Sequence, residues 1–115
     1  MYTADEIRGA TTEQAKLMVR ENIAQDDTWL IRGILALYAR QTQDEKDSES
    51  TEHDNKMGFN GFDAEILSSF SKQILAWQAQ AVKQYASPLS AKQVSLARKK
   101  MGKYAGQLAR IARGE

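Results

Sequence analysis

The stretch that decides the fold is residues 28–41, TWLIRGILALYARQ. Apolar side chains recur along it at helical spacing, and two further apolar residues widen the stripe over much of the helix circumference: Leu30, Ile34, Leu37 and Tyr38, widened by Ile31 and Leu35. A helix that is apolar over so much of its surface is usually surrounded by others. The stretch therefore predicts a central helix. Gly33 in its interior lowers helix propensity, and we expect it to allow a neighbouring helix to pack closely.

Two shorter helices are predicted before this one. Thr3 with Glu6, and Thr11 with Gln14, have the spacing of capping boxes, in which two side chains satisfy backbone N–H groups reciprocally. The first box predicts a short N-terminal helix that ends near Gly9. The second begins a longer, amphipathic helix.

Two long helices are predicted after the central one. Asn60 as N-cap, with Asp63 in the first turn, predicts a helix from about 62 to 86. Pro88 disfavours helical geometry at Ser87 and ends it. A third capping box, Ser90 with Gln93, starts a helix over 91–112. No stretch alternates as a β-strand does, so the sequence predicts an all-α fold: a compact bundle of four principal helices plus a short N-terminal helix.

Length and composition indicate one soluble domain spanning residues 1–115. The chain has a net charge of +1 and no Cys, which excludes disulfides and thiolate metal sites. Its N-terminal residues carry acids and no apolar stretch, and no apolar run has the length of a membrane span. We expect a cytoplasmic protein without membrane contact.

A polar acidic linker at 43–57 is predicted between the two helix pairs. Residues 43–56, QDEKDSESTEHDNK, contain no apolar side chain, and their side-chain charge is 2 − 6 = −4. Such composition is typical of a solvated connection or a frayed extension of the preceding helix.

The linker leads into a glycine-rich segment with two aromatic rings, which we interpret as a structural turn. Glycines permit a tight turn, and the rings would give it an apolar foot in the core. The alternative, a phosphate cradle at a helix N-terminus, lacks the Lys and Ser/Thr of a P-loop. The turn residues are Gly58, Phe59, Asn60, Gly61, Phe62 and Asp63.

Two stretches, 58–74 and 89–108, resemble a small module of phage, plasmid and integrated-element proteins. The pattern is a G-F-N-x-x-D-A turn followed by L-[ST]-x-K-Q, A-R-K and K-Y-x-x-Q-L. Similar segments are attached to bacterial helicase-like and primase-like proteins. The resemblance covers about half of the chain and implies a partner of DNA-processing machinery, with no catalytic residue. The matching positions are Gly58, Phe59, Asn60, Asp63, Ala64, Leu89, Ser90, Lys92, Gln93, Ala97, Arg98, Lys99, Lys103, Tyr104, Gln107 and Leu108.

Residues suited to catalysis or metal binding are few. His53 is the single histidine and lies in the acidic linker, and the serines at 68, 69 and 71 have no candidate base near them in sequence. We therefore predict no enzyme, no metal and no cofactor.

A basic stripe on the last predicted helix is the strongest candidate for a binding site. Residues 87–115 have a side-chain charge of 7 − 1 = +6. At helical spacing, four of the cations fall on one side, opposite the apolar residues: Lys92, Lys99, Lys103 and Arg110. A stripe of this kind is typical of contact with a phosphate backbone, and the alternative is an ordinary solvated face.

These patterns predict a non-enzymatic accessory protein of a mobile genetic element. It would act near DNA processing and would use the weakly basic face of its last helix. Its partner would be DNA or a DNA-processing protein. One alternative is a protein–protein interaction module without nucleic-acid contact, which binds a partner helix or forms a homo-oligomer. Another is an inhibitor whose acidic linker imitates phosphates.

Overall fold

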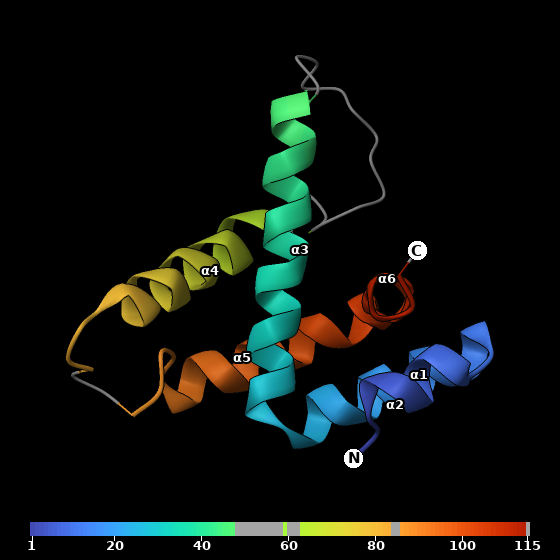
Figure 1. Ribbon diagram of the computed structural model, residues 1–115. Helices are drawn as coiled ribbons and strands as arrows, with labels where there is room; N and C mark the ends of the chain where they lie inside the picture. The colour runs from blue at the N-terminus through green and yellow to red at the C-terminus, as the bar shows by residue number, and fades with distance from the viewer. Residues whose placement is uncertain (48–58, 60–62, 84–85, 115) are drawn as a thin grey trace.

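The structure, a computed structural model, describes residues 1–47, 59, 63–83 and 86–114, with residues 41–47 described by their backbone alone (Figure 1). All regular secondary structure in these ranges is helical, which confirms the predicted all-α fold. In chain order, the elements are α1 (Ala4–Gly9), α2 (Thr12–Gln25), α3 (Asp27–Asp47), α4 (Ala64–Ala79), α5 (Ala91–Met101), the 3-10 turn η1 (Gly102–Tyr104) and α6 (Ala105–Ala112).

The helix starts follow from local chemistry. All three predicted capping boxes are present, with both reciprocal bonds in each: Thr3 with Glu6, Thr11 with Gln14, and Ser90 with Gln93. The carboxylate of Asp26 accepts the backbone N–H of Thr28 at 2.8 Å, which caps the start of α3. The sequence alone therefore placed three of these helix starts by their capping boxes.

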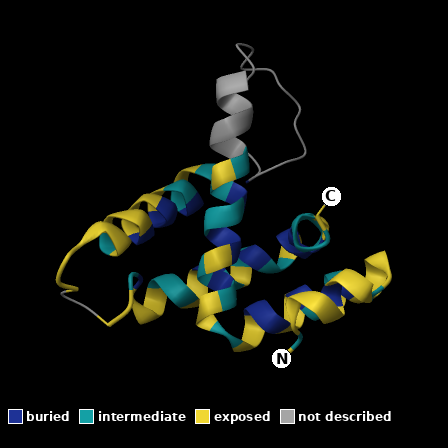
Figure 2. Ribbon diagram, viewed as in Figure 1, coloured by how far each residue is buried: buried dark blue, intermediate teal, exposed yellow. Residues whose placement is uncertain are grey.

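Helix α3 is central, as its apolar circumference predicted. It packs against α2, α4, α5 and α6, and its side chains Leu30, Ile34 and Leu37 are fully buried (Figures 1 and 2). A Cβ atom on Gly33 would lie 3.1 Å from Leu108 Cδ1 of α6. The missing side chain lets α6 approach closely, which confirms the prediction for this glycine.

The two predicted helix pairs interleave. Helix α6, near the end of the chain, packs on α2 and also contacts α1. The buried amide of Asn22 accepts the backbone N–H of Tyr2 and donates to its carbonyl, both at 2.9 Å, which fixes the N-terminus on α2. Elements from both ends of the sequence thus share one core.

Helix α4 is shorter than predicted: it ends at Ala79, and the prediction that it continues to 86 was wrong. Gln80 already has extended geometry, and Val82 beyond it is 83% exposed. The described helices provide no surface that would bury residues 80–83, and tertiary packing supplies most of the stability of a helix in a protein.

The last helix is also not continuous, because η1 interrupts it at residues 102–104. The chain changes direction there, and α6 is seen end-on in a view in which α5 runs across the picture (Figure 1). Each part has a different main neighbour: α5 packs mostly on α3, whereas α6 packs mostly on α2.

The predicted acidic linker is described only at its start. Residues 43–47 continue α3, as in the second of the two interpretations given for this segment, an extension of the preceding helix. The remaining linker positions lie outside the described residues, as do Gly58, Asn60, Gly61 and Phe62 of the predicted turn.

Candidate functional site

Asp63 immediately precedes α4, and its carboxylate is fully buried. We expected Asn60 to cap this helix and Asp63 to lie in its first turn. Instead α4 begins at Ala64, and Asp63 at the N-cap position makes no side-chain capping bond. The prediction that Asp63 lies in the first turn was therefore wrong, and its buried side chain faces the core.

Three side chains from the junction of α5 and η1 surround this carboxylate. The Tyr104 hydroxyl donates to Asp63 Oδ2 at 2.8 Å, and Lys103 Nζ lies 2.6 Å from the same oxygen. Lys100 Nζ donates to Oδ1 at 3.2 Å. We call these four residues the Asp63 cluster. Their spacing, i, i+3 and i+4 from Lys100, places the three donors on one side of the chain.

The cluster keeps its carboxylate ionised. Burial by itself would raise the pKa of Asp63 from its ordinary value of 3.8. Hydrogen bonds from Lys103, Tyr104 and Lys100 outweigh burial and lower the pKa to about 2. Charge-assisted bonds in a low-dielectric site are the stronger kind, so the carboxylate joins α4 firmly to η1.

Phe59 provides the apolar wall of the cluster. Its ring is 7% exposed and stands edge-on to Tyr104, with 6.0 Å between ring centroids and 71° between planes. Phe59 is thus buried in the core, while Phe62 and most of the predicted turn lie outside the described residues. The contact fixes the Tyr104 ring from which the hydroxyl reaches Asp63.

Sequence analysis missed the cluster, although one signal was present. Phe59, Asp63, Lys103 and Tyr104 all belong to the pattern that resembles the mobile-element module, and the fold brings them together. Lys100 lies outside that pattern. Nothing in the local sequence around Asp63 distinguished a buried carboxylate from an ordinary helix start.

The predicted basic stripe is divided by the fold. Lys92 and Lys99 lie two turns apart on α5, are exposed and have no ion-pair partner among the described residues. Lys103 belongs to the Asp63 cluster, with its side chain 47% exposed. Arg110 is exposed on α6, which runs in a different direction from α5 (Figure 1), so the four cations do not share one continuous helix.

Another cation of this region, Arg98, has a structural role. Its Nε donates to the carbonyl of Ile23 at 2.9 Å, and its guanidinium forms an ion pair with Asp27. Arg98 therefore ties α5 to the end of α2 and the start of α3.

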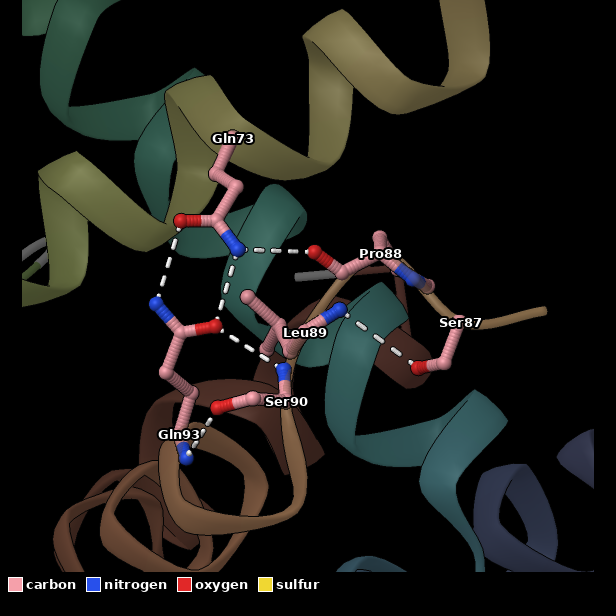
Figure 3. A pocket seen from close by; sticks show the side chains of 6 residues that line it. All are labelled: Gln73, Ser87, Pro88, Leu89, Ser90 and Gln93. Atoms are coloured by element: carbon pink, nitrogen blue, oxygen red, sulfur yellow. Dashed lines mark hydrogen bonds between the residues drawn. The ribbon is translucent and has the colours of Figure 1, made fainter. Parts of the chain in front are cut away.

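A hollow of about 290 Å³ lies between α4 and the segment that leads into α5 (Figure 3). The side-chain amides of Gln73 and Gln93 form two hydrogen bonds with each other across it, at 2.8 and 3.0 Å. Gln73 Nε2 also donates to the Pro88 carbonyl at 2.9 Å. These groups are satisfied by one another, so the hollow has the character of a joint between helices.

No metal-binding group occurs in the described part of the chain. It contains no group of three or more His, Cys, Asp or Glu side chains placed to share a metal ion, and His53 lies outside it. Of the three serines considered as nucleophiles, Ser71 is buried and donates to the Leu67 carbonyl at 2.8 Å, a hydrogen bond within α4. None of the described helices combines the length and apolar character that crossing a bilayer requires.

Comparison of the chain with models of protein families, with curated proteins and with solved structures found no match.

Proposed function

We propose that this protein is a non-enzymatic accessory protein that binds the phosphate backbone of DNA weakly through the exposed side of α5. The observation that carries the proposal is the pair Lys92 and Lys99, which lie on one side of α5, exposed and without an ion-pair partner in the described chain. Seven residues of helix separate their Cα atoms by about 10 Å, so their long side chains can reach separate phosphates. The resemblance to a module beside DNA-processing enzymes adds the expected setting, a mobile genetic element.

The charge balance of α5 supports the same proposal. Residues 91–114 contain no acidic side chain, and Asp27 and Asp63, the carboxylates that pair with their cations within the described residues, come from other elements. Neither of these acids pairs with Lys92 or Lys99. Few contacts predict weak, sequence-tolerant and strongly salt-dependent binding, because counterion release supplies most of the free energy.

Fluorescence anisotropy of labelled duplex and single-stranded DNA across a salt series tests the proposal. The double variant Lys92→Gln with Lys99→Gln should bind more weakly than the unmodified protein. Its log–log salt slope should fall by roughly 0.9 for each lysine that had neutralised a duplex phosphate, or roughly 0.7 on single strands.

The double variant Lys16→Gln with Lys72→Gln is the matched control, since it removes the same charge from α2 and α4. We expect its salt slope to stay unchanged. Absence of binding by the unmodified protein at about 50 mM salt, or an equal loss in the control, would contradict the proposal.

The second candidate function is a protein–protein interaction module. Leu75, on the outer side of α4, is 44% exposed, and Val82 just beyond the helix is 83% exposed. Exposed apolar groups on a helix that packs mainly on one neighbour favour a partner helix or a second copy of the chain. Analytical ultracentrifugation of the unmodified protein and of Leu75→Ser tests the second copy, because a concentration-dependent dimer should be lost in the variant.

A further inference from the structure

The two lysines of the Asp63 cluster form ion pairs with a carboxylate of the protein, whereas Lys92 and Lys99 of α5 have no ion-pair partner among the described residues. Lys100 Nζ and Lys103 Nζ lie 3.2 and 2.6 Å from the two oxygens of one buried carboxylate. The two ammonium groups and the carboxylate together carry a net charge of +1, which is half the charge of the two lysines alone. An external anion near the surface therefore meets a partly neutralised group.

The carboxylate also has advantages over an external phosphate. It is fully buried, it receives a third hydrogen bond from Tyr104, and the Phe59 ring packs against that tyrosine. Attraction between opposite charges is stronger at a buried site than in water, and salt screens it less. A phosphate approaching Lys103 from solvent would have to compete with an anion that is already in place.

We infer that Asp63 is an internal counter-anion that withholds Lys100 and Lys103 from external polyanions, so that Lys92 and Lys99 are the contact groups of α5. The part that concerns DNA rests on the proposed function. The inference explains why Lys103, 47% exposed and on the predicted stripe, should contribute little to binding although it reaches the surface.

A measurement without DNA tests the withholding directly. Brief acetylation with a water-soluble reagent, followed by mass spectrometry, gives a rate for each lysine. Lys103 should react several-fold more slowly than Lys99 in the unmodified protein. In Asp63→Asn its rate should approach that of Lys99, because asparagine retains the size of the side chain and removes the charge.

Binding to labelled duplex DNA provides the second measurement. Lys103→Gln should weaken binding clearly less than Lys99→Gln, and Asp63→Asn should tighten it. The salt slope of Asp63→Asn should steepen by about 0.9 for each lysine that becomes able to neutralise a phosphate. Glu65→Gln is the matched control, since it removes an exposed negative charge two residues further along. It should have a smaller effect than Asp63→Asn.

The outcomes separate the inference from the proposed function. Equal acetylation rates for Lys103 and Lys99, or equal losses of DNA binding on their replacement, overturn the inference. This comparison uses exposed lysines and stays decisive even if Asp63→Asn fails to fold. Slow acetylation of Lys103 in a protein that binds no DNA supports the counter-anion and contradicts the proposed function.

Discussion

Helices α6 and α4 are attached to the same central helix in different ways. Helix α6 packs through apolar contact, and the absent side chain of Gly33 lets Leu108 lie against the backbone of α3. Helix α4 also buries apolar residues, but polar bonds hold its start at Asp63 and its middle at Gln73. The stability that apolar packing contributes does not depend on pH, whereas the contribution of a buried carboxylate changes when it is protonated. The position of α4 should therefore depend on pH, and that of α6 should not.

The difference also explains where the candidate site lies. The polar attachment of α4 uses side chains of α5 and η1, a segment with five basic side chains and no acidic one. Charges that hold the fold together and charges that are open to a ligand therefore occur within a few residues of each other. Only the contacts in three dimensions distinguish them.

The largest effect should come from the apolar attachment of α6. Leu108→Ala removes buried methyl groups above Gly33 and should lower the free energy of unfolding by about 3 kcal/mol, within the usual range for such a truncation. Urea denaturation followed by circular dichroism measures it. A loss below about 1 kcal/mol would mean that this contact collapses easily and that α6 is held elsewhere.

Gly33→Ala provides the matched test of the close approach. Alone it should change stability by less than about 1 kcal/mol, because the gain in helix propensity is opposed by a methyl group 3.1 Å from Leu108 Cδ1. In the Leu108→Ala background the same substitution should stabilise by about 1 kcal/mol, since the obstacle is gone. Equal effects in both backgrounds would contradict the described packing.

The next effect should come from acid, and it should act on the attachment of α4. The folded pKa of Asp63, about 2, lies below its ordinary value of 3.8, so the carboxylate stabilises the fold above that value. This contribution is lost as the pH falls toward 2. The stability difference between the unmodified protein and Asp63→Asn should therefore shrink by about 2 kcal/mol between about pH 6 and about pH 2.

Denaturation of both proteins at a series of pH values measures that difference, and other acids cancel in it. Amide hydrogen exchange adds the location: Asp63→Asn should weaken protection in α4 more than in α2 and α6. A stability difference that stays constant with pH would show that the cluster contributes no charge-dependent stability.

The smallest effect should come from the amide pair between α4 and α5. Gln73→Ala removes exposed hydrogen bonds and should cost about 0.5–1 kcal/mol. Gln93→Ala should cost about 1 kcal/mol more, because it also breaks the capping box with Ser90. A double-mutant cycle with urea denaturation isolates the pair, and a coupling of zero would leave the Asp63 cluster as the main polar attachment of α4.

The sequence by itself determined the features that neighbouring residues settle. The three capping boxes and the central helix could be predicted because a cap needs only a side chain and a backbone N–H two or three residues away, and an apolar stripe needs only helical spacing. The sequence predicted a close helix contact at Gly33, but it did not identify Leu108 as the residue that makes this contact.

Tertiary structure alone decided the features that depend on residues far apart. The end of α4 at Ala79 reflects the absence of a described helix that would bury residues 80–83. The break at η1 lets α5 pack mostly on α3 and α6 mostly on α2. Asp63 and Tyr104 are separated by 41 residues, yet they share a hydrogen bond. Local pattern places a carboxylate at a helix start. Only the packing decides whether it faces water or is buried against two lysines, because that depends on desolvation and on partners brought in by the fold.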